Sequence, residues 1–148
     1  MSDDDDGAEV LVIDGANVVG SRPDGWWRDR AGAAARLHDQ LRDRQRRDRQ
    51  RGDGPTLAPW VVLVLEGQAR AGVPETAAEG SGTPQALTVV HAAGEGDDRI
   101  VEEAGRAVAA GRVVAVVTAD RGLSTRLQAV GAQVLRPGWL LGRLENAR

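Results

Sequence analysis

Acidic residues stand at the ends of four apolar runs in this sequence. If these runs are parallel strands, their carboxyl ends share one edge of the sheet, where α/β proteins bind their ligands. Acids from four distant parts of the chain would then meet at one rim. The runs and their acids are "EVLVID" (9–14) with Asp14, "WVVLVLEG" (60–67) with Glu66, "ALTVVHA" (86–92) with the following Asp97 and Asp98, and "RVVAVVTAD" (112–120) with Asp120.

A cluster of carboxylates implies a particular chemistry. Neighbouring carboxylates repel and raise one another's pKa, and a hard divalent cation relieves that repulsion. Mg²⁺ or Mn²⁺ suits an all-oxygen site, and the lack of Cys, with only His91 near these strand ends, argues against zinc. Such a cation can activate water and neutralise charge on a phosphodiester. The predicted metal ligands are Asp14, Asp97, Asp98 and Asp120, with Asp14, Asp97 and Asp120 as the catalytic residues.

Polar residues beside these acids are candidates for substrate contacts. Asn17 lies three residues beyond Asp14, where it can bind a metal-held water, bind a phosphate or cap the loop. Arg22 and Arg121 lie beside the acidic rim and suit contacts to phosphates. Glu66 is a weaker candidate, either as a substrate contact, as an extra metal ligand or as a solvated strand end.

The acids also have purely structural interpretations. Asp14 followed by Gly15 is a common turn at the end of a strand. Asp97 or Asp98 can cap the helix that they open, and Asp120 can cap the helix that follows it. Capping and metal binding can coincide, so both interpretations stay open.

Apolar strands alternate with helical patterns along the chain. Strands buried on both faces and separated by helices are typical of a parallel sheet with helices on both sides. A 3.6-residue apolar stripe predicts a helix from about Trp26 into the late forties, and the stripe stops after Leu41. The remaining predictions are a mobile loop without regular structure at 68–85, helices opened by Asp97 and Asp98, over 121–130 and over the C-terminal "GWLLGRLENAR", and a short fifth strand at 132–137.

Length and composition bound the class of protein. A chain of 148 residues suits one domain, and we expect 9–148 to form it after an acidic, disordered tail at 1–8. The lack of Cys excludes disulfides and thiol chemistry. The sequence shows no signal peptide and no apolar run long enough to cross a bilayer, which favours a cytoplasmic protein without a membrane partner.

The basic residues are concentrated in one segment. Nine of the 19 Arg lie within 28–51, and the chain has no Lys. This segment is either an electrostatic arm for RNA phosphates or a solvated helix end in which Asp43 and Asp48 pair with neighbouring Arg. Trp26 and Trp27 can stack on a base, although we expect at least one of them to belong to the core.

Three motifs together resemble a known family. "VIDGANVV" (12–19), "GEGDDRIVE" (94–102) and "VVTADRGL" (116–123) are similar, in order and spacing, to the motifs of the YacP-like NYN domains within the PIN-like nuclease superfamily. The resemblance covers nearly the whole chain, from about Glu9 to Leu144. It implies a three-layer α/β/α fold with a parallel sheet of about five strands in the order 3-2-1-4-5, and a metal-dependent ribonuclease activity.

The resemblance also assigns roles by position, with one departure. Family members commonly carry a second acid two residues after the Asp of the fourth strand, and this chain has Gly122 there. Carried over residue by residue, Asp14, Asp97 and Asp120 match the acidic metal ligands, Asp98 and Asn17 match accompanying polar positions, and Glu66 stands at a strand end that is often acidic.

The sequence thus predicts a Mg²⁺- or Mn²⁺-dependent endoribonuclease that hydrolyses RNA phosphodiesters. Gly122 keeps open an alternative, an RNA-binding or adaptor module of the same fold with weak or no catalysis. A phosphohydrolase with a covalent intermediate on Asp14 is disfavoured, because Ala16 replaces the second Asp of such enzymes and no Lys is present. The RNA target, the number of metal ions, protein partners and the oligomeric state, a homodimer included, are left open.

Overall fold

A five-stranded parallel sheet forms the centre of the molecule. The computed structural model describes residues 8–23, 25–51, 57–76 and 87–145. The strands lie in the order β3-β2-β1-β4-β5, and every neighbouring pair is parallel, which confirms the expected fold class. The strands are β1 (Val10–Asp14), β2 (Trp60–Leu65), β3 (Leu87–His91), β4 (Val114–Val117) and β5 (Gln133–Leu135).

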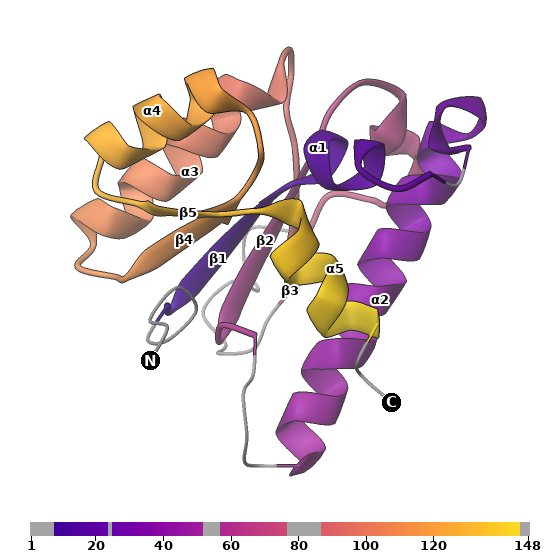
Figure 1. Ribbon diagram of the computed structural model, residues 1–148, viewed down its shortest axis with the longest axis horizontal. Coiled ribbons are helices and arrows are strands. Elements are labelled where there is room, and N and C mark those ends of the chain that lie inside the picture. Colours follow the sequence, from indigo (N-terminus) through magenta and orange to yellow (C-terminus); the bar gives the residue numbers. More distant parts are fainter. Residues whose placement is uncertain (1–7, 24, 52–56, 77–86, 146–148) are drawn as a thin grey trace.

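Helices cover both faces of the sheet and complete three α/β/α layers. Figure 1 shows α3 and α4 on one side of the sheet and α2 with α5 on the other. No helix within the described ranges is long and apolar enough to cross a membrane. The helices are α1 (Gly15–Gly20), α2 (Arg30–Arg51), α3 (Gly96–Ala109), α4 (Arg121–Ala129) and α5 (Pro137–Glu145), with 3₁₀ helices η1 (Trp26–Arg28) and η2 (Gly67–Gly72).

Alternation along the strands divides the core into two layers. Leu11 and Ile13 of β1 belong to the cluster that includes the buried leucines of α2 and α5. Val10 and Val12 belong to the opposite cluster, which includes Ile100 of α3 and the leucines of α4. Because successive side chains of a strand point to opposite faces, the row of Val10 and Val12 leads to Asp14, on the side of α3.

The connections differ from the sequence-based expectation at three places. The predicted turn after β1 is the short helix α1, which Asp14 caps by accepting a hydrogen bond from Asn17 N. The helix expected from Trp26 is interrupted at Asp29, whose carboxylate caps α2 by accepting from Gly32 N (2.8 Å). The first part of the expected loop 68–85 belongs to η2. The remainder of that prediction falls largely on 77–86, and the tail prediction on 1–7, both outside the described residues.

In the second half of α2, the buried side chains are polar. The apolar stripe ends at Leu41, but Arg44, Gln45 and Asp48 continue it along the same helix face and are each less than 9% exposed. Arg44 Nε donates to Asp48 Oδ1 (2.9 Å), and Arg44 Nη1 donates to the carbonyl oxygen of Arg143 in α5 (2.6 Å). The helix therefore stays packed on the molecule beyond its last leucine.

The same ion pair also fixes the chain after α2. Asp48 Oδ2 accepts a hydrogen bond from Leu57 N (2.9 Å), just before β2 begins. Arg42 and Arg46 pair instead with Asp39 and Asp43 at the surface. These arginines therefore follow the second interpretation of the Arg-rich segment, in which neighbouring Asp and Arg residues of the helix pair with one another.

We expect Asp48→Ala to lower the free energy of unfolding by about 3 kcal/mol, because it leaves the buried Arg44 without its carboxylate and Leu57 N without its acceptor. Urea unfolding measures the change. Asp43→Ala is the matched control, since its partner Arg46 is exposed and such pairs contribute about 0–1 kcal/mol. Equal losses in the two variants would contradict the structural role of the buried pair.

Candidate functional site

The candidate site lies where the strand order reverses. β1 pairs with β2 on one side and with β4 on the other, so the connections leave its carboxyl end in opposite directions. Asp14 ends β1 and is 6% exposed, and Thr118 follows β4 and is 1% exposed. Thr118 Oγ1 donates a hydrogen bond to Asp14 Oδ2 (2.8 Å). A buried carboxylate is thus held at the switch point of the sheet.

Burial and the surrounding acids both disfavour the charged form of Asp14. Burial raises the pKa of Asp14 above its ordinary value, and the hydrogen bonds from Thr118 and from Asn17 N act in the opposite direction. The negative charges of Asp97 and Glu66 raise the pKa of Asp14 further. The acids that follow β2 and β3 therefore act directly on the acid that ends β1.

Asp97 joins this group from the first turn of α3. Burial raises its pKa, and the charge of Asp120 is the next largest cause, followed by Glu95. Arg126 lowers the pKa of Asp97 in part. Asp97 thus links the acid after β4 to the acid at the end of β1.

Two glycines allow the close packing of this region. A Cβ on Gly96, the first residue of α3, would lie 2.7 Å from Glu66 Oε1, so the carboxylate occupies the place of a side chain. A Cβ on Gly15 would lie 2.6 Å from the carbonyl oxygen of Val64. Gly15 is therefore required by the close approach of α1 to β2 and is not the turn residue that the sequence suggested.

Besides the bond to Asp14, two hydrogen bonds fix the segment after β4 internally and a third ties it to α1. Asp120 N donates to Thr118 Oγ1 (3.2 Å), and Asp120 Oδ1 caps α4 by accepting from Leu123 N (2.9 Å). Asn17 Oδ1 accepts from Ala119 N (2.9 Å). The capping interpretation of Asp120 is correct, and its second carboxylate oxygen takes no part in the Leu123 bond. The side-chain oxygen of Asn17 has a structural partner.

Two of the expected site residues have partners on neighbouring helices. Asp98 is exposed and accepts a hydrogen bond from Arg126 Nη2 of α4 (2.9 Å). Arg22 donates to Gln40 Oε1 of α2 (2.6 Å), which holds it against that helix. Arg121 is exposed at the start of α4 and, together with Asn17, lines a cavity of about 650 Å³ beside the acidic rim. Arg121 is therefore the better placed of the two arginines.

The donor set of the rim suits a hard cation, because Asp14, Glu66, Asp97 and Asp120 offer only carboxylate oxygens. Within the described part of the chain, however, no group of three or more His, Cys, Asp or Glu side chains is arranged to hold a metal ion as it stands. Asp97 is half-buried and Asp120 is exposed, so both carboxylates have room to turn. The rim has the right chemistry and would need side-chain rotation to bind a cation.

Reasoning from the acids of the sequence did not single out Thr118. Its hydroxyl accepts from Asp120 N and donates to Asp14, so it connects two candidate ligands. Strand alternation could have indicated this contact, since Val116 pairs with Val12 and two further residues on each strand lead to Thr118 and Asp14.

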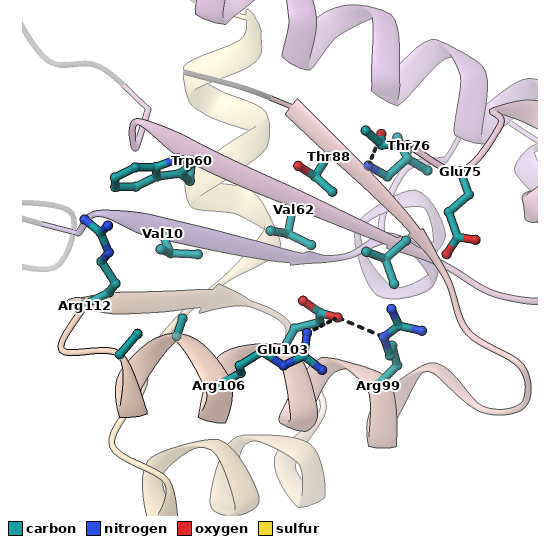
Figure 2. A pocket seen from close by; sticks show the side chains of 14 residues that line it. Val10, Trp60, Val62, Glu75, Thr76, Thr88, Arg99, Glu103, Arg106 and Arg112 are labelled. Atoms are coloured by element: carbon teal, nitrogen blue, oxygen red, sulfur yellow. Dashed lines mark hydrogen bonds and ion pairs between the residues drawn. The ribbon is translucent and has the colours of Figure 1, made fainter. Parts of the chain in front are cut away.

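A separate cavity of about 760 Å³ lies on the α3 side of β2 and β3. Figure 2 shows Arg99, Glu103 and Arg106 along one wall and Trp60 with Arg112 at one end. Arg99 and Arg106 both pair with Glu103, and Arg112 lies over the Trp60 ring (4.1 Å). The arginines of this cavity therefore already have acidic or aromatic partners.

The fold and the acidic rim define the class: a three-layer α/β/α fold with the strand order expected from the PIN-like resemblance, and with carboxylates gathered at the switch point of the sheet. Among solved structures, the chain is similar to a mutant of Rae1 (YacP) from Bacillus subtilis, with a TM-score of 0.63 and 18% sequence identity, over 94% of this chain and 76% of that chain. At this identity the similarity shows a YacP-like fold. No family model and no curated protein matches the sequence.

The raised pKa of Asp14 has a measurable consequence for stability. The folded protein holds this proton more tightly than the unfolded chain, whose reference value is 3.8, so the stabilisation is complete below that pH and is lost as pH rises through the folded pKa. We expect Asp14→Asn to gain stability relative to wild type as pH rises from about 4 to 7. Urea unfolding at several pH values, with a chelator present, measures the difference.

The matched control is Glu102→Gln, which removes one exposed acid of α3 away from the rim and corrects for the general effect of net charge. A difference between wild type and Asp14→Asn that does not change with pH, or that changes in the opposite direction, would contradict the raised pKa.

Proposed function

We propose that the protein is a Mg²⁺- or Mn²⁺-dependent endoribonuclease that hydrolyses RNA phosphodiesters, with the cytoplasm as its compartment. The observation that carries the proposal is the coupling of Asp14 with Asp97 and Glu66, and of Asp97 with Asp120, at the switch point. Neighbouring acids with raised pKa values are typical of functional sites. The three motifs that resemble YacP-like NYN domains supply the reaction class.

The residues have distinct proposed roles. Asp14, Asp97 and Asp120 would hold the cation, with Glu66 beside them, and the cation would supply charge neutralisation and a more acidic water. Thr118 is a positioning residue, because its hydroxyl fixes Asp14 and receives Asp120 N. Arg121 and Arg136 line the neighbouring cavity and would bind backbone phosphates of RNA.

A cleavage assay tests the proposal. Purified protein is mixed with labelled single-stranded RNA and Mn²⁺, and we expect cleavage that a chelator stops. Asp14→Asn is expected to reduce the rate by about 100-fold or more, since even residues behind a metal ligand typically contribute 10- to 100-fold. Mn²⁺ should raise the melting temperature of wild type more than that of Asp14→Asn.

Glu102→Gln, purified identically, is the control, because Glu102 pairs with Arg99 and Arg106 on the surface of α3. It should cleave at close to the wild-type rate. If wild type and Asp14→Asn degrade RNA equally, the activity is a contaminant and the proposal fails.

A second candidate function is an RNA-binding or adaptor module with weak or no catalysis. Two observations favour it: Gly122 stands where a further acid is usual in the resembled family, and the described residues contain no ready-made metal ligand group. RNA binding that weakens with salt, persists in a chelator and is never followed by cleavage would support this function.

The structure has room for an acid at Gly122. A Cβ there would meet only Asp120 Oδ1, at an ordinary contact distance of 3.5 Å. We expect Gly122→Asp to bind Mn²⁺ about tenfold more tightly than Gly122→Ala, because it adds a carboxylate beside Asp120. Calorimetric titration with Mn²⁺ measures the affinity.

Gly122→Ala is the matched control, because it adds a Cβ at the same position without a carboxylate. Equal Mn²⁺ affinities of the two variants would show that this position does not face the cation.

A further inference from the structure

A small cavity opens beside the acidic rim, on the side of α1. It has a volume of about 160 Å³ and is enclosed by α1, η1, the start of α2 and the segment from Leu65 to Ala69. Two of its lining residues belong to the rim itself: Gly15 follows Asp14 in the chain, and Glu66 is one of the acids that raise the pKa of Asp14. A group bound in this cavity would therefore lie next to the candidate metal ligands.

One wall of the cavity is a firmly held aromatic ring. Trp26 is half-buried, packs against the larger core cluster and meets Trp27 edge to face, with ring centroids 6.0 Å apart. The guanidinium of Arg30, which also lines the cavity, lies 4.9 Å from the centroid of the Trp26 ring. The guanidinium therefore lies over the ring, and both aromatic rings and Arg guanidinium planes are common stacking platforms for nucleobases of single-stranded nucleic acids.

The rest of the lining suits the edge of a base. Ala16 and Val19 of α1 give apolar surface, while Gln68, exposed on η2, offers an amide with two donors and an acceptor. The volume is below that of pockets for complete small molecules, which are about 300–1,000 Å³, and so suits one planar ring system rather than a whole nucleotide.

We propose that this cavity binds one unpaired base of the RNA strand, immediately beside the phosphodiester at the acidic rim. The base stacks against Trp26 and Arg30, and its edge meets the Gln68 amide. The proposal rests on the proposed function for the identity of the bound strand. It adds a position at which the protein requires an unpaired base, and so predicts a preference for single-stranded RNA over duplex.

Binding in a chelator tests the proposal without cleavage. A short single-stranded RNA is compared with a set of RNAs in which one base at a time is replaced by an abasic site. We expect one abasic position to weaken wild-type binding by roughly tenfold, in the range that stacking on an aromatic side chain contributes. Trp26→Leu should lose a similar factor with intact RNA and lose nothing further with that abasic RNA.

Trp27→Leu is the matched control, because Trp27 is 55% exposed, neighbours Trp26 and does not line the cavity. It should bind both RNAs within about twofold of wild type. Ala16→Leu is a second variant that fills the cavity from an exposed helix position, and it should reproduce the loss seen for Trp26→Leu. Circular dichroism and a cooperative melting transition above the assay temperature establish that the variants are folded.

The base-binding proposal is overturned if no abasic position matters, if Trp26→Leu and Trp27→Leu bind alike, or if Ala16→Leu binds as well as wild type. The proposed function survives these results as long as Asp14→Asn still abolishes metal-dependent cleavage. If the folded protein neither binds nor cleaves RNA, the proposed function fails, and the base-binding proposal fails with it.

Discussion

The hydrogen bond from Thr118 Oγ1 to Asp14 Oδ2 joins the ends of two neighbouring strands at the one place where the chain connections diverge. The same hydroxyl accepts Asp120 N, so a single side chain fixes the acid of β1 and the start of the loop that carries the acid of α4. A buried carboxylate needs such donors, because removal from water disfavours its charge. The geometry of the rim therefore depends on Thr118 as much as on the acids, and Asn17, bonded to Ala119 N, supports the same loop from α1.

Strand alternation explains which acids meet. Val12 and Asp14 point to the side of α3, as do Val64 in β2 and Val116 in β4, so the residues two positions further on each strand approach the beginning of α3. The sequence predicted the sheet and the shared rim because continuous apolar runs and alternating helices constrain a parallel sheet strongly. It did not predict that Asp98 would turn to Arg126 and Arg22 to Gln40. Those pairings depend on side chains of neighbouring helices, and the spacing of the motifs does not indicate where those side chains lie.

The places where the structure differs from the sequence-based expectation have one cause in common. There, polar side chains determine the local structure and the hydrophobic pattern gives no information. A six-residue helix such as α1 is too short for a periodic stripe and depends on the carboxylate of Asp14 as its cap. The interruption before α2 depends on Asp29 in the same way. Beyond Leu41 the periodicity continues in Arg44 and Asp48, which a search for apolar residues cannot detect. Their burial could be understood only with the partners, Arg143 and Leu57, that the fold brings to them.

The bond between Arg44 and Arg143 joins residues 99 positions apart in the chain. Closing so long a loop costs conformational entropy before any contact offsets it, whereas α2 itself can form from local interactions. We therefore expect α5 to dock onto α2 late in folding, after the strands between them have paired. Interactions made that late act mainly on the rate of unfolding. We therefore expect the polar half of α2 to slow unfolding more than it speeds folding.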